Sequence, residues 1–111
     1  MIKLLAFLKR KDGITFEEFS NYWKDNHGPL VKKLLPEAKR YVQNHARKGS
    51  EKGEQPFDGV AELWFESDEA WKKTAAAFGG EEGKTIQKDE LNFLDQSKSV
   101  FFVTEEKVIK A

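Results

Sequence analysis

The sequence predicts an α+β fold in which helices lie on one face of a four-stranded antiparallel sheet. Three observations support this prediction: four short apolar segments with strand character, helical stretches after the first and third of them, and a length of 111 residues. The order strand, helix, strand, strand, helix, strand is that of a ferredoxin-like split βαβ sandwich. A chain of this length suits one compact domain, so residues 1–111 are expected to form a single domain.

The first strand is predicted over about residues 2–9, where the apolar run IKLLAFLK ends at the turn signal RKDG. This run is too short for a membrane span or a secretion signal. The first helix follows the turn. Thr15 can cap it, and Glu18 can return a hydrogen bond to the Thr15 backbone, which together make a capping box.

Apolar residues spaced three to four apart continue this helix, at Phe16, Phe19, Tyr22 and Trp23. The helix is expected to end near Asn26 or His27. Gly28 suits a left-handed cap, and Pro29 cannot continue the hydrogen-bond ladder. A short helical turn is expected to follow over residues 30–36.

Two further strands are predicted over residues 38–46 and 59–66, where apolar and aromatic residues recur between turn signals. The segment between them is rich in charge and contains glycine. Residues 47–58 are therefore predicted to form a mobile loop near the mouth of any pocket.

Ser67 begins a second predicted helix over residues 68–78, which the glycine-rich residues 79–83 terminate. A further helical piece is expected over residues 85–94. It leads into the last strand, residues 99–106.

The composition argues against several function classes. The 19 basic and 19 acidic residues balance, and neither sign forms a long block, which argues against nucleic acid and membranes as partners. The chain has no cysteine, so a reducing cytoplasm is the expected location. Two isolated histidines and the lack of a phosphate-binding glycine loop predict no metal and no cofactor, with haem held by one histidine as an alternative.

Apolar side chains occupy both faces of the first and last strands, which normally indicates burial on both sides. In the first strand, for example, Leu4 and Ala6 alternate with Leu5 and Phe7. Two crossover helices cover only one face of such a sheet. A second copy packed sheet to sheet is the simplest cover, so a homodimer is predicted; a monomer with one partly hydrophobic face is the alternative.

The middle strands carry polar and aromatic side chains. Tyr41, Gln43 and His45 alternate along one strand and therefore share a face. Glu62 and Trp64 of the next strand are expected to join them on the face away from the helices. An apolar space with a few hydrogen-bonding groups has the makeup of a small-molecule pocket, in which Glu62 is a second candidate for proton transfer.

The two histidines receive different interpretations. His27 follows Phe19 and Trp23 in steps of four, which carries it along the buried helix face toward the sheet. It can act there as an acid or base, or merely cap the helix. His45 is expected to share a cavity with His27 without contacting it, or to be a solvated residue beside the charged loop. Trp23 lies on the same stripe, which favours a core position.

The stretch FSNYWKDNHGPLVKKLLPEAKRYVQNH resembles the signature of the EthD family. In that signature a helix ending in His-Gly-Pro is followed by a proline and by a Tyr-x-Gln-x-His strand. ELWFES before the second helix and FVTEE near the end match as well. The resemblance implies a dimeric α+β barrel made of two ferredoxin-like subunits.

The resemblance also implies a small hydrophobic ligand, which would be aromatic, polyketide-like or xenobiotic. Enzymatic relatives include cofactor-independent monooxygenases, isomerases and lyases, so acid/base chemistry without a cofactor is one expectation. A non-catalytic binding or accessory protein of a degradation pathway is the alternative, and a purely structural dimer is a third. The catalytic candidates are His27 and Tyr41. The candidates for ligand contact are Trp23, Gln43, His45, Glu62 and Trp64.

Overall fold

The structure, a computed structural model, describes residues 1–47 and 55–111. One four-stranded antiparallel sheet forms its centre, with the strand order β2-β3-β1-β4. The strands are β1 (Ile2–Leu8), β2 (Arg40–His45), β3 (Gly59–Phe65) and β4 (Val100–Glu105). This order is that of a ferredoxin-like split βαβ sandwich, so the predicted fold class is confirmed.

Most of the segment predicted to form a mobile loop, residues 47–58, lies outside the described residues. Its last part is described. Asp58 is buried, and its backbone N–H donates to the Leu8 carbonyl at 2.7 Å. One carboxylate oxygen of Asp58 also accepts from the Arg10 backbone at 2.9 Å. These bonds hold the start of β3 against the end of β1.

The first helix, α1 (Phe16–Tyr22), begins as predicted. Thr15 Oγ1 accepts from the Glu18 backbone N–H at 3.0 Å, and Glu18 Oε1 accepts from the Thr15 N–H at 3.0 Å. The capping box is therefore confirmed.

The first helix does not end where the sequence predicted. It continues into a π-helical turn, Trp23–His27, and then into α2, Gly28–Leu34. Gly28 has a φ of −56°, which is right-handed helical, so the expected left-handed cap is wrong. Its N–H bonds to the Trp23 carbonyl five residues back. This shift of one residue in the ladder lets the helix pass Pro29, which has no N–H.

Two glycines allow close approach between this helix and the sheet. A Cβ atom on Gly28 would lie 2.7 Å from Gln43 Nε2 of β2. A Cβ atom on Gly59 of β3 would lie 2.4 Å from Cζ3 of the Trp23 indole. Both distances are shorter than van der Waals contact, so neither position has room for a side chain. Tight packing therefore explains the glycine at position 28.

The second helical stretch contains α3 (Asp68–Phe78) and α4 (Glu81–Glu90). Ser67 caps α3 through its side-chain oxygen, as predicted. The further helical piece begins at Glu81 rather than at residue 85. Two acidic residues in its first turn interact favourably with the positive end of the helix, which explains the earlier start.

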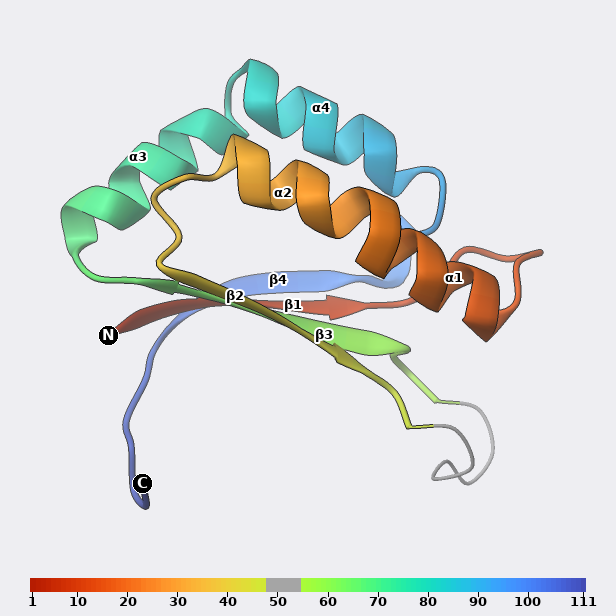
Figure 1. Cartoon of the computed structure of the whole chain (residues 1–111), viewed down its shortest axis with the longest axis horizontal. Coiled ribbons are helices and arrows are strands. Elements are labelled where there is room, and N and C mark those ends of the chain that lie inside the picture. Colours follow the sequence, from red (N-terminus) through yellow and green to blue (C-terminus); the bar gives the residue numbers. More distant parts are fainter. Residues whose placement is uncertain (48–54) are drawn as a thin grey trace.

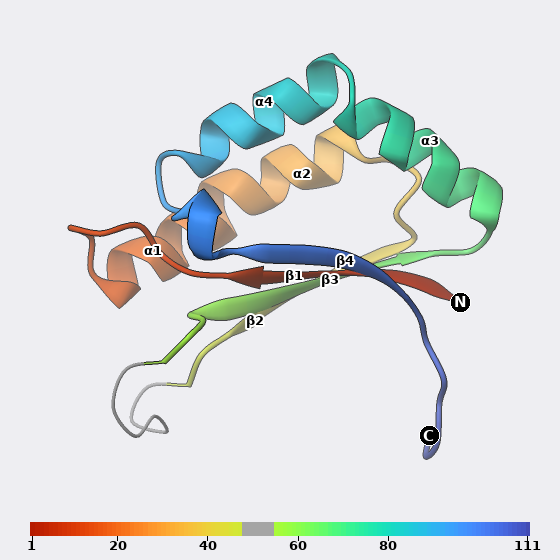
Figure 2. The same ribbon diagram turned by 180° about the vertical axis from the view of Figure 1, so that it is seen from behind.

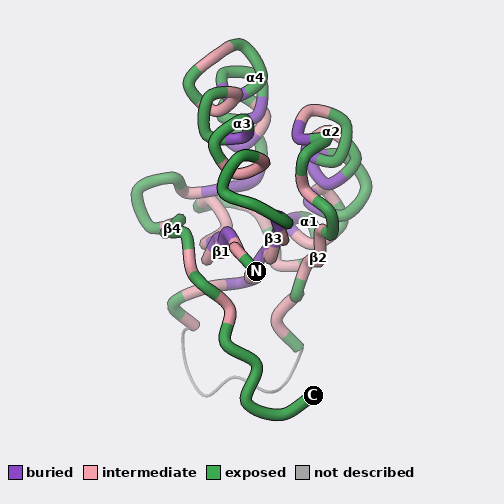
Figure 3. Tube along the Cα trace, turned by 90° about the vertical axis from the view of Figure 1, so that its left-hand side faces the viewer, coloured by how far each residue is buried: buried purple, intermediate pink, exposed green. Residues whose placement is uncertain are grey.

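All helices lie on one face of the sheet (Figure 1). Seen from the end of the sheet, the row α1–α2 stands over β2 and β3, while α3 and α4 stand over β1 and β4 (Figure 3). The core fills the space between the two layers. Its largest fully buried apolar side chains are Phe19, Trp23, Phe65 and Phe93. No helix among the described residues has the length and apolar character that a membrane span requires.

The opposite face of the sheet has no helical cover within the described part of the chain (Figure 2). We call it the open face. Phe7 and Phe102 stack there with ring centroids 5.8 Å apart, and Phe57 contacts Phe7. The C-terminal residues extend past the sheet on this side and leave Ile109 almost fully exposed (Figure 1). The face is therefore apolar in part, and no other described element of the chain packs on it.

Gly59→Ala is expected to destabilise the protein by about 1–3 kcal/mol, because the new methyl group would force the buried Trp23 indole out of place. Urea unfolding measures the difference. The matched control is Gly79→Ala at the end of α3, where the nearest atom to the new Cβ is 3.6 Å away. The control should be neutral or slightly stabilising. Equal effects of the two substitutions would contradict the tight contact at Gly59.

Candidate functional site

A cavity of about 50 Å³ lies between the sheet and the two helical rows. Its wall is mostly apolar and includes core side chains such as Leu63, Ile86 and Phe101. Three ionisable side chains line it as well: His27, Tyr41 and Glu90. An apolar cavity with a few convergent polar groups is the usual makeup of a small-molecule site.

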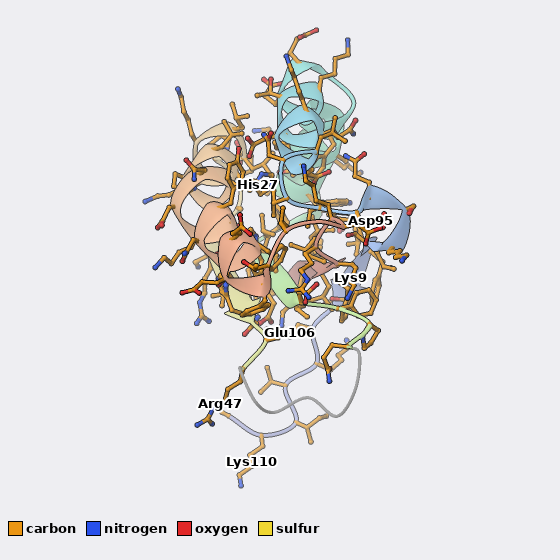
Figure 4. The ribbon with its side chains drawn as sticks, turned by 90° about the vertical axis from the view of Figure 1, so that its right-hand side faces the viewer. Lys9, His27, Arg47, Asp95, Glu106 and Lys110 are labelled. Atoms are coloured by element: carbon orange, nitrogen blue, oxygen red, sulfur yellow. The ribbon has the colours of Figure 1, made fainter. Side chains whose placement is uncertain are left out.

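His27 ends the π-helical turn and is 5% exposed. It lies where the α1–α2 row faces α4 (Figure 4), and its ring centroid is 4.7 Å from that of Phe93. Its Nδ1 atom is 2.8 Å from Asp89 Oδ2 of α4. The predicted step of four from Trp23 therefore does bring His27 to the buried face of the helix.

Asp89 holds the imidazole in one orientation. Burial raises the pKa of Asp89, but hydrogen bonds from Tyr22 and His27 outweigh it and leave the pKa below its ordinary value. Tyr22 Oη donates to Asp89 Oδ1 at 2.6 Å, and Asn92 Nδ2 donates to Tyr22 Oη at 2.9 Å. Asp89 is therefore a carboxylate that can only accept, so Nδ1 of His27 must carry the proton.

The other nitrogen of His27 is available for chemistry. Burial lowers the pKa of His27, and the nearby Asp89 only partly opposes this, so the ring is neutral near neutral pH. With the proton on Nδ1, Nε2 has a lone pair. No hydrogen bond joins Nε2 to any other described residue. His27 thus presents a base to the cavity.

Tyr41 reaches the cavity at the end of a chain of hydrogen bonds. Gln43 Nε2 donates to Tyr41 Oη and to the Trp23 carbonyl, both at 3.0 Å. Burial raises the pKa of Tyr41, so its hydroxyl keeps its proton. Because the hydroxyl oxygen already accepts from Gln43, its proton can point to a ligand.

His45 supports this chain from outside the cavity. Its Nε2 lies 2.9 Å from Gln43 Oε1, and its Nδ1 lies 2.6 Å from Ser20 Oγ. Its ring centroid is 4.4 Å from that of Trp23. Trp23 lines the cavity, whereas His45 is not among the lining residues. The structure therefore does not bring His45 into the cavity of His27. Nor is it a solvated residue, because both ring nitrogens are bonded and the side chain is half-buried.

The expectation that Glu62 and Trp64 share a face with Tyr41 is wrong. In the observed register Tyr41 pairs with Leu63, so it faces the helices, while Glu62 pairs with Val42 on the open face. Directly paired residues of antiparallel strands point to the same side. Gln43 of β2 is accommodated under the helices because the π-helical turn offers it the Trp23 carbonyl.

Glu62 is not poised for proton transfer. Lys3 Nζ lies 2.8 Å from Glu62 Oε2 and 2.6 Å from Glu106 Oε2, and it stands over the Trp64 ring. The hydrogen bond from Lys3 lowers the pKa of Glu62, so Glu62 remains a paired carboxylate. Trp64 Nε1 in turn donates to Glu106 at 3.2 Å. These residues form a charged cluster on the open face.

Glu90 is a site residue that the sequence interpretation missed. It is 7% exposed, and Gln96 Nε2 donates to its Oε1 at 3.1 Å. Burial raises its pKa. The signal was present in the sequence, because Glu90 lies four residues after Ile86 and three before Phe93 on one apolar stripe. Asp89 was missed too, although it lies three residues after Ile86 and four before Phe93.

Within residues 1–47 and 55–111, no group of three or more His, Asp or Glu side chains is placed to hold a metal ion. The ionisable side chains that line the cavity are those of His27, Tyr41 and Glu90.

Known proteins resemble this chain in sequence and fold. The family model of the EthD domain matches residues 11–97. An ethyl tert-butyl ether D (EthD) family protein from Bacillus halodurans is 24% identical, with a TM-score of 0.72 over 96% of this chain and 99% of its own. An EthD-like protein from Ralstonia eutropha is also 24% identical, with a TM-score of 0.72 over 99% of this chain and 95% of its own.

A third structure, from Bacteroides fragilis, is described as a dimeric protein of unknown function with a ferredoxin-like fold. It is 10% identical, with a TM-score of 0.64 over 95% of each chain. At these identities, the three structures support the fold alone. No curated protein sequence shows significant similarity to the chain.

Glu90→Gln is expected to change how stability depends on pH. The folded-state pKa of Glu90 is raised above its ordinary 4.5, so its stabilisation is present below that pH and is lost as the pH rises through the folded pKa. Glutamine keeps the shape but never ionises. The variant should therefore lose less stability than the unmodified protein between about pH 5 and about pH 8, by urea unfolding.

His27 has the opposite effect, because its lowered pKa costs stability as the pH falls below 6.5. This effect is present in the unmodified protein and in Glu90→Gln, so it cancels in the comparison. Glu37→Gln changes an exposed carboxyl and serves as the control. Identical pH profiles for Glu90→Gln and the control would show that Glu90 is not held in its acid form.

Proposed function

This chain belongs to the EthD family, and from that membership we propose that it binds a small hydrophobic molecule between its helices and its sheet and moves a proton on it at His27. The observation that carries the proposal is the state of His27. A carboxylate holds its Nδ1–H at 2.8 Å, while the ring lines a mostly apolar cavity and its Nε2 has no hydrogen-bond partner among the described residues. A positioned neutral imidazole of this kind is a general base that works near neutral pH.

Tyr41 is the second catalytic candidate. Its proton can bind a carbonyl or hydroxyl oxygen of the ligand, and Gln43 fixes the direction in which the hydroxyl points. His45 and Gln43 act through this chain rather than by direct contact, and Trp23 forms part of the wall. Glu62 and Trp64 belong to the charged cluster on the open face, and we assign them to an interface between subunits.

The volume of the cavity limits the ligand. At about 50 Å³ it is far smaller than the roughly 300–1,000 Å³ of sites for drug-sized molecules. A small ligand with few heavy atoms suits it as it stands. An aromatic or polyketide-like ligand requires the wall to open, and Phe101, which is 47% exposed, marks the side where the cavity approaches the surface.

We also propose that two copies pack through their open faces to form an α+β barrel. The Bacteroides fragilis relative of this fold is described as dimeric. In this chain, the stacked pair of Phe7 and Phe102 and a nearby charged cluster lie on a face without cover in the described part of the chain. Association through this face would remove that apolar surface from water. The cysteine-free sequence supports a cytoplasmic location for the assembly.

The ligand proposal is tested with phenol as a small aromatic probe. NMR signals of cavity residues such as Ile86 should shift on titration with phenol. His27→Gln should keep this binding, because the base is not needed for burial of an apolar ring, but should abolish any turnover. Ala61→Leu fills the cavity and should abolish binding. A wild-type protein that binds no phenol would contradict an aromatic ligand, whereas binding without turnover by any substrate would favour the accessory role.

The interface is tested with two neighbouring residues of β4. Phe102 and Val103 are similarly exposed, at 47% and 42%, but they point to opposite faces. Phe102→Glu should weaken the dimer strongly, since a buried unpaired carboxylate is costly. Val103→Glu should leave it intact. Light scattering across a concentration series reports the mass, and a monomeric wild-type protein at micromolar concentration would exclude the dimer.

A further inference from the structure

We propose that Glu90 is the proton donor of the cavity, and that the molecule it serves is a small uncharged carbonyl compound with an acidic C–H bond beside the carbonyl group. This inference rests on the proposed function, because it needs a ligand in the cavity and His27 as the base. It adds a second catalytic residue and a substrate class.

Two neighbouring carboxyl groups on α4 have different surroundings. Successive helical residues point about 100° apart, so Asp89 and Glu90 meet different surroundings. Asp89 accepts hydrogen bonds from Tyr22 and His27. Glu90 lines the cavity instead, with one bond from Gln96 to Oε1 and no partner for Oε2 among the described residues.

These surroundings shift the pKa values of the two carboxyl groups in opposite directions. Burial favours the uncharged form of Glu90, and the negative charge of Asp89 adds to this preference. Asp89 stays ionised because its hydrogen bonds stabilise the charge. Two neighbouring carboxyl groups whose surroundings shift their pKa values in opposite directions are typical of an acid and a supporting anion in one site.

The cavity is lined by a base and two hydrogen-bond donors and by no lysine or arginine. His27 provides a lone pair, while Glu90 and Tyr41 provide O–H groups. No lysine or arginine is among the residues that line the cavity. A carboxylate or phosphate group would therefore be buried there unpaired, which is costly. A neutral ligand with one oxygen acceptor and one removable proton satisfies all three groups.

These groups support a keto–enol proton shift that balances without a cofactor. His27 Nε2 takes the proton from the carbon beside the carbonyl as the C–H bond breaks. The electron pair of that bond forms a C=C bond, and the carbonyl oxygen takes the Glu90 proton. The products are the enol, an imidazolium and a carboxylate. Return of the proton from His27 to a carbon, and of the hydroxyl proton to Glu90, regenerates both side chains.

Acetylacetone is a suitable probe because it is small, uncharged and readily enolised. Exchange of its central C–H protons for deuterium is followed by NMR in deuterium oxide, with wild type, Glu90→Gln and His27→Gln compared. Each variant should slow the catalysed exchange by about 10²-fold or more, the usual contribution of a general acid or base. Glu37→Gln, which changes an exposed carboxyl, should exchange at the wild-type rate.

A second readout does not depend on activity. The infrared spectrum of the wild type near neutral pH should contain the band of a protonated carboxyl group, and Glu90→Gln should lose it. Absence of this band from the wild type would overturn the assignment of Glu90 as the donor. Glu90→Gln also conserves volume and the bond to Gln96, so its fold can be checked by urea unfolding.

The outcomes separate this inference from the proposal on which it rests. If His27→Gln abolishes exchange and Glu90→Gln does not, Glu90 is not the donor and His27 remains the base. If the wild type binds phenol but accelerates no exchange, the carbonyl substrate class is wrong and ligand binding stands. A wild-type protein that binds neither phenol nor acetylacetone would remove the proposed function itself.

Discussion

The π-helical turn at Trp23–His27 is the constraint on which the rest of the site depends. It lets one helix run through Pro29, so that His27 stays on the buried stripe instead of ending a helix in solvent. The same turn leaves the Trp23 carbonyl able to accept from Gln43 as well as from Gly28. The turn thereby connects the helix to β2 and fixes Tyr41 through Gln43.

Electrostatics then divides the polar groups between two environments. On the helix side Asp89 gathers enough donors to remain ionised, while Glu90 next to it has a single donor and deeper burial. On the open face the charges of two carboxylates are stabilised by Lys3, which lies between them and over an indole ring. Lys3 is paired with two carboxylates on the open face, whereas burial in the cavity favours the uncharged forms of His27, Tyr41 and Glu90.

The sequence predicted the architecture well because strand order, capping and helical periodicity are local signals. Thr15 with Glu18 and the stripe through Phe19 and His27 are examples. The face of the sheet on which each strand residue lies was harder to predict. Alternation shows which residues of one strand share a side, but it does not show how neighbouring strands are paired. Glu62 was misplaced for that reason. The helix end was misjudged because a π turn, which depends on tertiary packing at Gly28, let the helix pass a proline.

The edge strand β4 links the two faces of the molecule. Phe101 lines the cavity, and the adjacent Phe102 stacks on Phe7 of the open face. Because consecutive residues of a strand point to opposite sides, a surface that packs on Phe102 also restrains the backbone that carries Phe101. A partner subunit on the open face would therefore stiffen the cavity wall from behind. In a single chain β4 is an edge with exposed side chains on both faces, so the wall of the cavity at Phe101 is its least supported part.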